Sequence, residues 1–466
     1  MSEKTRILLV RPYQNRDAES LMPPLGLMYL ASYLRRRDDA DVRIIDMTPS
    51  RIGYDNLGEE IRNFRPDWLG ISALTFESLG LHRVAAIAKV IRPGLPVVAG
   101  GPHPSAYTNR VMEDGNIDFA VVGEGELTAD DLNHALRTGG PVDAIDGLAW
   151  RQNGFIRANP RRRHVEDLDA LPFPAWDLVD IPSYRRFDRM SRSGINDYMV
   201  LFTSRACPYQ CLYCHKIFGK SFRARSPENV VAEIRALYDT YGVREFEIID
   251  DIFNCDLPRA KRIFDLIIES GMKIRFALPN GIRGDHADEE FFAKARRAGA
   301  VYMSFAIETA SPRLQTMIRK NIQLDKIRHS IGLARKEGIF CQGLFMLGFP
   351  SETREELLTT VDFAVRSKLH AAHLFIVNPY EGTDLAELAR KMGKPVFNDF
   401  STNYLTSGFT NLTNLSDGEV NRIRRRGLMR FWLKPSRVWA IVRDYPLKSR
   451  LPYLATVLIR RLLLRI

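Results

Sequence analysis

The sequence predicts an α/β protein with a doubly wound parallel sheet first, a partial barrel of six β/α units next and a basic helical region last. Short apolar runs alternate with amphipathic stretches along most of the chain, which is typical of parallel strands covered by helices. Glycine and proline cluster where the early runs end, and such sheets bind ligands at the carboxyl ends of their strands. A length of 466 residues exceeds one hydrophobic core, so we expect two or three domains.

Residues 1–145 form the first predicted domain, a Rossmann-like sheet. Its expected strands are Arg6–Val10, Val42–Ile45, Asp67–Ala73, Val97–Gly100 and Asp118–Gly123, and helical patterns cover Leu25–Arg37, Asn56–Phe64 and Leu79–Ile91. Three segments rich in glycine or proline interrupt this series where strands end: Pro23–Gly26, Gly100–Pro102 and Gly123–Gly125. We expect them at the edge of the sheet where a ligand would bind.

Residues 146–195 are predicted to be a connector, since they hold Pro160, three consecutive arginines and the segment Leu171–Trp176. Residues 196–395 then hold a second β/α series. Its strands are Tyr198–Ser204, Glu245–Ile249, Lys273–Leu278, Val301–Ile307, Phe340–Leu347 and Ala371–Val377, and its helices are Pro227–Tyr241, Leu257–Ser270, Asp288–Arg297, Leu324–Glu337 and Thr353–Lys368. Six strands with five intervening helices predict an incomplete (β/α) barrel. Residues 396–466 complete the chain as a helical basic region.

Composition narrows the classes of function. The chain is 45 % hydrophobic and 26 % charged, an ordinary balance for a folded protein. No apolar stretch is long enough to span a bilayer and no signal peptide is evident, so we expect a cytoplasmic protein. Three of the five cysteines fall within eight residues, which favours a metal site over disulfides.

Cys207, Cys211 and Cys214 follow the first barrel strand with the spacing C-x3-C-x2-C. Thiolates are the natural ligands of iron–sulfur clusters, and three of them leave one iron of a 4Fe–4S cubane open to another group. The alternative is a zinc site with His215 as the fourth ligand. His215 directly follows Cys214, which strains a tetrahedral cage, and no second ligand pair exists in the sequence.

This motif, with the aromatic Tyr213 before its third cysteine, resembles that of the radical S-adenosylmethionine superfamily over residues of about 195–395. The resemblance implies that S-adenosylmethionine chelates the open iron and is cleaved to a 5′-deoxyadenosyl radical. It also implies cofactor contacts from Tyr213 in the motif, Asp250 and Asp251 after the second strand, and Glu308 after the fourth. Further implied contacts are Gly348 in the segment Gly343–Thr353, and Asn378 and Pro379 in the loop NPYEGT. In that loop Glu381 replaces a usual proline, which leaves its contacts open.

The first domain resembles the cobalamin-binding domain that is fused to many radical enzymes, through the segments Met22–Arg35, Ser72–Ser78, Ala99–Ser105 and Asp118–Glu126. The cobalamin-binding residues that it implies are Pro24, Leu25, Gly26, Ser72, Leu74, Thr75, Gly100, Gly101, His103, Gly123, Glu124 and Gly125. The pattern D-x-H-x-x-G is absent, so we expect base-off cobalamin without a histidine ligand, its lower face near Leu74–Ser78. A flavodoxin-like domain without ligand is the alternative. Methylthiotransferases carry three cysteines in this part, whereas residues 1–206 contain none.

The resemblance implies an enzyme that methylates an unactivated carbon of a hydrophobic, lipid-like or natural-product substrate. One S-adenosylmethionine would methylate cobalamin and a second would generate the radical that prepares the substrate carbon for methylcobalamin. A reductase, flavodoxin or ferredoxin would supply electrons. The rival within the class is cyclisation or rearrangement without net methyl transfer, and the rival of another class is a non-catalytic iron–sulfur or corrinoid carrier.

Positive charge is concentrated at the C-terminus. Residues 421–466 hold thirteen Lys or Arg and one acid, Asp444, whereas the rest of the chain is close to neutral. A general nucleic-acid surface is therefore not expected. Arginines mixed with Trp, Phe and Leu predict either a peripheral contact with anionic membranes or helices docked on the barrel with a solvated basic face.

Overall fold

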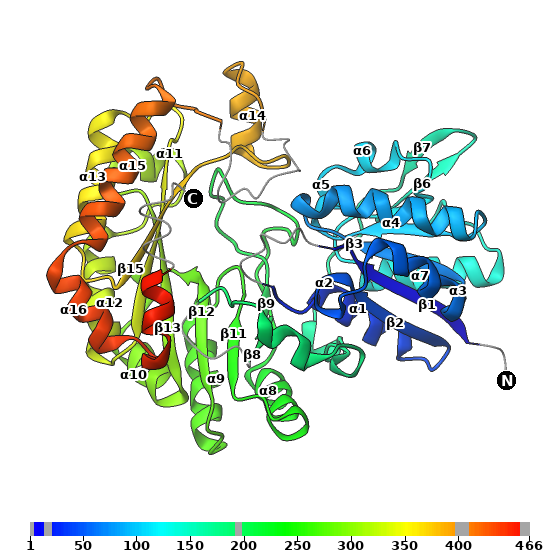
Figure 1. Cartoon of the computed structure of the whole chain (residues 1–466), viewed down its shortest axis with the longest axis horizontal. Helices are drawn as coiled ribbons and strands as arrows, with labels where there is room; N and C mark the ends of the chain where they lie inside the picture. The colour runs from blue at the N-terminus through cyan, green and yellow to red at the C-terminus, as the bar shows by residue number, and fades with distance from the viewer. Residues whose placement is uncertain (1–3, 14–20, 192–197, 397–409, 457–466) are drawn as a thin grey trace. The chain divides into compact units, whose positions relative to one another are not determined.

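The computed structural model describes residues 4–13, 21–191, 198–396 and 410–456. The chain divides into two compact units (Figure 1). The first comprises the chain up to Asp188 together with Ile217–Gly219, and the second comprises most of the remainder from Arg189 onward.

The first unit is built on a seven-stranded sheet with the order β2-β1-β3-β4-β5-β6-β7. The strands are β1 (Thr5–Arg11), β2 (Ala40–Asp46), β3 (Trp68–Ser72), β4 (Val97–Gly100), β5 (Phe119–Val121), β6 (Leu148–Gln152) and β7 (Phe155–Ala158). Those from β1 to β5 pair in parallel. The helices are α1 (Leu25–Arg35), α2 (Met47–Ser50), α3 (Tyr54–Phe64), α4 (Ser78–Ile91), α5 (Pro102–Ala106), α6 (Thr108–Met112) and α7 (Glu126–Thr138).

Successive residues of β1 point to opposite faces of this sheet. Leu8 packs in one core with Leu57 of α3 and Val84 of α4. Leu9 packs in a second core with Leu27 of α1 and Leu132 of α7. Helices therefore cover both faces, and the predicted doubly wound, Rossmann-like domain is confirmed.

The hairpin β6–β7 lies within residues 146–195, which are predicted to be a connector. It extends the sheet antiparallel to β5, so the sheet continues beyond residue 145. Its turn is Asn153-Gly154, and both residues have positive φ, 52° and 81°. Asn-Gly between two strands is a strong hairpin signal, because both residues tolerate the left-handed conformation that this turn requires.

The second unit contains a six-stranded sheet with the order β15-β14-β13-β12-β11-β8. The strands are β8 (Tyr198–Leu201), β11 (Glu245–Ile248), β12 (Arg275–Ile282), β13 (Ala300–Glu308), β14 (Phe340–Leu347) and β15 (Ala371–Ile376), and β9 (Ser204–Arg205) pairs separately with β10 (Arg223–Ala224). The helices are α8 (Pro227–Tyr241), α9 (Leu257–Glu269), α10 (Glu289–Ala298), α11 (Pro312–Met317), α12 (Leu324–Lys336), α13 (Arg354–Arg366) and α14 (Asp384–Lys391). All neighbouring strands of the six are parallel and follow chain order, which confirms the predicted partial barrel.

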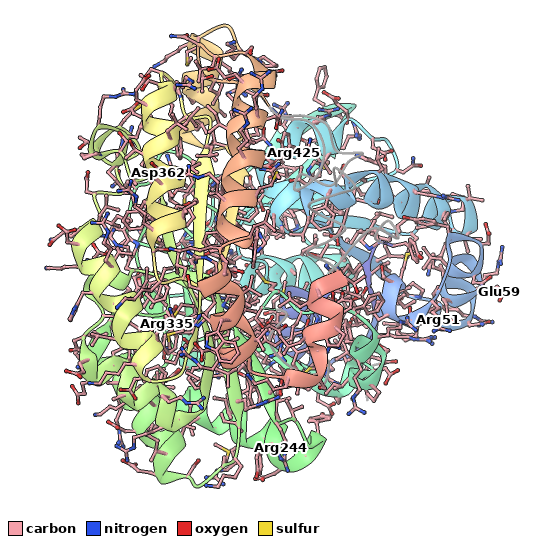
Figure 2. All side chains as sticks on the ribbon, turned by 60° about the vertical axis from the view of Figure 1, so that its left-hand side comes forward. Arg51, Glu59, Arg244, Arg335, Asp362 and Arg425 are labelled. Atoms are coloured by element: carbon pink, nitrogen blue, oxygen red, sulfur yellow. The ribbon has the colours of Figure 1, made fainter. Side chains whose placement is uncertain are left out.

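The C-terminal region forms α15 (Asp417–Trp432) and α16 (Pro435–Asp444) on the barrel (Figure 1). Helix α15 contacts α13 and β15. Arg430 of α15 pairs with Asp362 of α13 at 2.8 Å, and Figure 2 labels Asp362 on the helix beside α15. Ile441 of α16 packs in a core with Tyr302 and Phe340 of the barrel. Residues 457–466 of the predicted basic region lie outside the described residues. Across the described ranges no helix is both long and apolar enough to cross a bilayer.

Candidate functional site

The three predicted cysteines lie in one loop that begins directly after β9. Ala206, which precedes Cys207, has a φ of 69°, and Cys214 N–H donates to the carbonyl of Cys211 at 3.1 Å. Cys211 is buried, and the other two are partly exposed. A hydrogen bond with the Cys214 thiol lowers the pKa of Cys211, and the nearby Lys320 acts in the same direction.

The donor set of this loop fits a 4Fe–4S cluster. In the described parts of the chain, no three His, Cys, Asp or Glu side chains converge closely enough to hold one metal ion. Structural zinc needs four ligands that converge on one ion, whereas each thiolate that holds a cubane binds a different iron. Three thiols without a fourth protein ligand therefore match a cluster with one open iron.

The two neighbouring aspartates after β11 have different surroundings. Asp250 is buried and accepts three hydrogen bonds, from the backbone N–H and hydroxyl of Thr203 and from the hydroxyl of Ser204. It therefore fixes the start of the cysteine loop. Asp251 is more exposed and its Oδ1 lies 3.4 Å from Nε2 of His215. Of the two, Asp251 is the more accessible carboxylate.

Glu308 is the last residue of β13, and Gly348 and Asn378 lie just after β14 and β15. Glu308 is buried, has a φ of 65° and pairs with Nζ of Lys320 at 2.8 Å. Gly348 has a φ of 92°, and its N–H donates to the carboxylate of Glu352 at 2.6 Å. Burial raises the pKa of Glu352 to about 7. Asn378 is buried and accepts the N–H of Thr410 at 3.1 Å.

The loop that begins with Asn378 and Pro379 continues directly into α14. The Thr383 hydroxyl accepts the N–H of Ala386 and so caps the helix. Glu381, which stands where related loops have proline, pairs with Arg390 of the same helix. Glu381, in place of proline, therefore stabilises the junction between this loop and α14.

These loops meet around the cysteine loop. Leu212 packs in one apolar cluster with Ile318 after α11, Phe349 after β14, Val377 after β15 and Leu385 of α14. Two backbone bonds reinforce this packing: Leu212 N–H donates to the Ile318 carbonyl at 3.0 Å, and Leu385 N–H donates to the Leu212 carbonyl at 2.8 Å. The Tyr213 ring lies 5.9 Å from that of Phe349. Segments far apart in sequence therefore hold the cysteines from several sides.

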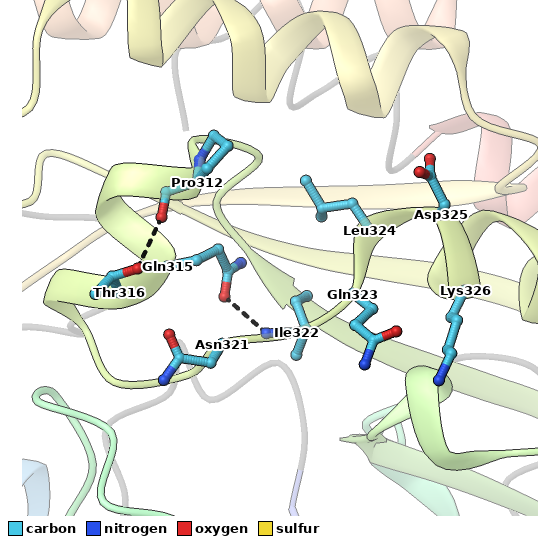
Figure 3. A pocket seen from close by; sticks show the side chains of 9 residues that line it. All are labelled: Pro312, Gln315, Thr316, Asn321, Ile322, Gln323, Leu324, Asp325 and Lys326. Atoms are coloured by element: carbon cyan, nitrogen blue, oxygen red, sulfur yellow. Dashed lines mark hydrogen bonds between the residues drawn. The ribbon is translucent and has the colours of Figure 1, made fainter.

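An open cavity of about 480 Å³ lies nearby, between α11 and the start of α12 (Figure 3). Polar and apolar residues both line it, Gln315 and Asn321 among the polar ones and Ile322 and Leu324 among the apolar ones. The side-chain amide of Gln315 is occupied internally, because it donates to the carbonyls of Ile307 and Thr309.

In the first unit, the predicted cobalamin-binding loops lie at the carboxyl edge of the sheet. The loops after β3, β4 and β5 are linked: His103 N–H donates to the Ala73 carbonyl at 3.0 Å, and Gly123 N–H donates to the Ser105 hydroxyl at 2.9 Å. Gly101 has a φ of 92°, and a Cβ there would lie 2.7 Å from the Ser72 hydroxyl. This edge is preorganised rather than loose.

At the same edge, two glycines have free space where a side chain would stand. A Cβ at Gly26 or at Gly123 would have no neighbour within 4 Å. Leu74 and Thr75 are half-buried, and the Glu77 carboxylate accepts the N–H of Leu74 at 2.7 Å. Exposed glycine backbone beside a fixed turn is what a bulky corrin could approach, so these residues fit cobalamin.

Two predicted residues of this set are engaged inside the domain. His103 is buried and stacks on Tyr107 at 4.9 Å, and burial lowers its pKa to about 4. The Glu124 carboxylate accepts the N–H of Val165 at 2.8 Å. Leu25 is also buried, in the first turn of α1.

Sequence reasoning missed Lys320 and a buried network around Arg11. Nε of Arg11 donates to Glu77 at 3.0 Å, and its guanidinium also lies 3.5 Å from Asp46. Glu77 in turn holds Leu74, so this network supports the loop expected below cobalt. Neither Arg11 nor Lys320 belongs to a motif, and only the folded chain brings them to the sites.

Comparison with known proteins assigns both units. The family model of the B12 binding domain matches residues 15–133, and that of the Radical SAM superfamily matches residues 201–364. The uncharacterized methyltransferase PH0819 of Pyrococcus horikoshii is 33 % identical over 438 residues, which cover 92 % of this chain and 93 % of that protein. The chain belongs to the cobalamin-binding radical S-adenosylmethionine enzymes.

Two further proteins are similar to this chain. The anaerobic magnesium-protoporphyrin IX monomethyl ester cyclase of Rubrivivax gelatinosus is 26 % identical, over 86 % of this chain and 73 % of that protein. The radical S-adenosylmethionine methyltransferase TsrM from Kitasatospora setae, solved with cobalamin and a [4Fe–4S] cluster, has the same fold. It is 19 % identical, with a TM-score of 0.70 over 83 % of this chain and 75 % of that one.

Membership of the cobalamin-binding radical S-adenosylmethionine enzymes confirms the predicted enzyme class and the three predicted cofactors. These are the 4Fe–4S cluster, S-adenosylmethionine and cobalamin. The roles of individual residues within each site stay predictions.

Proposed function

We propose that this enzyme methylates an unactivated carbon of a small, hydrophobic substrate. The observation that carries the proposal is the similarity to a relative named as a methyltransferase along nearly the whole of both chains. That similarity spans both cofactor-binding units, so it covers the complete apparatus that radical methylation requires.

We assign the cluster to Cys207, Cys211 and Cys214. Asp251, Glu308, Gly348, Asn378 and Pro379 surround the cysteine loop and are the proposed contacts of S-adenosylmethionine. The edge formed by Pro24 to Gly26, Ser72 to Thr75, Gly100 to His103 and Gly123 to Gly125 is the proposed cobalamin site. When bound, the cofactors supply a substrate radical and a transferable methyl group, and the protein orients them and excludes water.

The test uses the anaerobically reconstituted enzyme, a chemical reductant, candidate hydrophobic substrates and S-adenosylmethionine labelled in its methyl group. We expect label in the product, with 5′-deoxyadenosine and S-adenosylhomocysteine formed in equal amounts, because two molecules of S-adenosylmethionine are consumed. The matched control is Cys207→Ala, which should form no labelled product.

Cyclisation or rearrangement is the second candidate, and the resemblance to the anaerobic cyclase of Rubrivivax gelatinosus favours it. This reaction would consume S-adenosylmethionine without transferring its methyl group. A converted substrate that carries no label, formed with 5′-deoxyadenosine alone, would select this candidate over methylation.

For partners, we propose a flavodoxin or ferredoxin as electron donor, because radical generation needs one low-potential electron for each cleavage. The test compares 5′-deoxyadenosine formation with flavodoxin, with ferredoxin and with neither present. We expect turnover with at least one protein donor. A rate no higher than that without a donor would contradict the proposal.

We also propose that α16 contacts anionic membranes. Val438, Trp439 and Val442 are exposed on one face of α16, and Leu433 is exposed just before it. Trp439 is 66 % exposed. Lys434 and Arg443 flank this face, and aromatic and basic side chains together suit the bilayer interface.

Vesicle co-sedimentation of the full chain tests the membrane contact. Trp439→Ser should weaken binding to vesicles that contain phosphatidylglycerol. Tyr241→Ser, which alters an exposed aromatic residue of α8, should leave binding unchanged. Equal binding of both variants and the unaltered protein would contradict the proposal.

A further inference from the structure

Lys320 is a buried cation next to the cysteine loop. Its Nζ lies 2.8 Å from the Glu308 carboxylate and 3.3 Å from the hydroxyl of Tyr213. Lys320 and Glu308 are each only 7 % exposed. Because buried charges need a compensating partner, the position of each of these side chains depends on the other.

The loop that carries Lys320 is fixed from both sides. The backbone N–H of Lys320 donates to the Gln315 carbonyl at 3.1 Å, and the backbone carbonyl of Lys320 accepts from the Arg283 guanidinium at 3.0 Å. The Gln315 side chain accepts the N–H of Ile322, drawn as a dashed line in Figure 3, and also binds the end of β13. Arg283 stacks over Tyr209 of the cysteine loop at 4.4 Å.

The backbone around this pair adopts uncommon conformations. Glu308, Arg319 and Asn321 have φ values of 65°, 56° and 51°, although none is glycine. Such conformations cost free energy and persist where the surrounding contacts enforce them, often at functional sites. Lys320 stands between two of these residues, so the chain is strained on both sides of the side chain that reaches Glu308 and Tyr213.

The charge of Lys320 lies beside the loop that carries the thiols. Its ammonium is 3.3 Å from the hydroxyl of Tyr213, which directly precedes Cys214, and Glu308 brings a negative charge to the same place. A cluster bound by three thiolates gains one further negative charge when it is reduced. Net charge near an iron–sulfur cluster is one of the factors that set its reduction potential.

We propose that Lys320 is a positioning residue of the cluster site, which holds Tyr213 and Glu308 in place and supplies the positive charge that balances the reduced cluster. The inference rests on the cluster of the family and not on methyl transfer. Lys320 therefore raises the reduction potential of the cluster, and Glu308 lowers it.

The test is a redox titration of the reconstituted full-length protein, followed by electron paramagnetic resonance, together with its iron content. Lys320→Met should shift the midpoint potential to a lower value and Glu308→Gln should shift it to a higher value. The double variant should return towards the unaltered protein, because it removes both charges. Lys320→Arg should stay close to the unaltered protein, and Lys326→Met, an exposed residue of the same region, is the matched control.

Opposite shifts in the two single variants support the proposal whatever the methylation assay shows. If Lys320→Met loses its iron, two other results support the proposal: full iron content in Lys320→Arg and a higher midpoint potential in Glu308→Gln. Midpoint potentials equal to that of the unaltered protein in both single variants, with full iron content, would overturn the proposal.

Discussion

His370 and Asp444 join the start of β15 to the end of α16. The backbone N–H of Cys341 donates to Nδ1 of His370 at 2.9 Å, so the ring proton is on Nε2, which lies 3.0 Å from the Asp444 carboxylate. The same carboxylate lies 3.2 Å from Arg335 of α12, labelled in Figure 2. The neutral imidazole thus anchors α16 to the barrel.

This anchor predicts a pH dependence of stability. Burial lowers the pKa of His370 from 6.5 to about 4, so the unfolded chain takes up a proton before the folded chain does. The stability that the neutral His370 side chain contributes is fully present above pH 6.5 and is lost as the pH falls towards 4. It amounts to at most about 3 kcal/mol.

Chemical denaturation at pH 7 and pH 5 measures this effect. His370→Phe should show a smaller loss of stability between the two pH values than the unaltered protein, whatever its stability at pH 7. The quantity to compare is the change in the free energy of unfolding between pH 7 and pH 5. His103 in the first unit lowers the free energy of unfolding over this range in both proteins, so it does not affect the comparison. Equal slopes would contradict the role given to His370.

Gly427 allows α15 to approach α13. A Cβ at Gly427 would lie 2.7 Å from a side-chain carbon of Val361, whereas a Cβ at Gly332 in α12 would meet nothing within 4 Å. Gly427→Ala should destabilise the protein by about 1–3 kcal/mol through overpacking. Gly332→Ala should be neutral or stabilising by up to about 1 kcal/mol, because alanine favours helix. Thermal unfolding of both variants tests the contrast, and equal effects would contradict it.

Substitutions of Asp250 and Asp251 should have different effects, the first on folding of the cysteine loop and the second on binding of S-adenosylmethionine. Asp250→Ala removes the acceptor of three buried hydrogen bonds to Thr203 and Ser204, so we expect loss of bound iron. Asp251→Asn should retain iron and bind S-adenosylmethionine more weakly. Iron assay and equilibrium binding measure the two effects. Full iron content in Asp250→Ala would show that the loop does not depend on this carboxylate.

Cobalamin should bind base-off in the first unit. The only histidine among the predicted cobalamin-binding residues, His103, is buried against Tyr107. The electron paramagnetic resonance spectrum of the cob(II)alamin form should therefore lack nitrogen superhyperfine splitting. Glu77→Gln should weaken cobalamin affinity, measured by absorbance, because Glu77 fixes Leu74. Nitrogen splitting, or no binding, would contradict the assignment.

The regular elements were largely predictable because their signals are local. The strands β8 and β14 coincide with apolar runs, and α8 has Ser226 as its N-cap and Gly242 in the left-handed conformation at its end. The cysteine spacing is equally local. The hairpin β6–β7 was missed although Asn153-Gly154 carried its signal, because the arginines and prolines that follow suggested irregular structure.

Contacts between distant segments could not be predicted. The resemblance implied cofactor contacts from both Asp250 and Asp251, and only the folded chain shows that Thr203 and Ser204 occupy Asp250. Lys320 belongs to no motif, and its place beside Glu308 depends on the loop after α11. Arg437, within the basic region, donates to the carbonyls of Val365 and Ser367 at the end of α13. Part of the C-terminal charge is therefore structural, which composition alone does not reveal.

The most direct test of the account is 5′-deoxyadenosine formation by the anaerobically reconstituted enzyme and its cysteine variants. The unaltered protein should bind about four irons at this site and cleave S-adenosylmethionine. Cys207→Ala, Cys211→Ala and Cys214→Ala should each form no 5′-deoxyadenosine, whereas Cys341→Ala, which alters a buried thiol of β14, should remain active. Normal 5′-deoxyadenosine formation in any one of the first three variants would contradict the central claim.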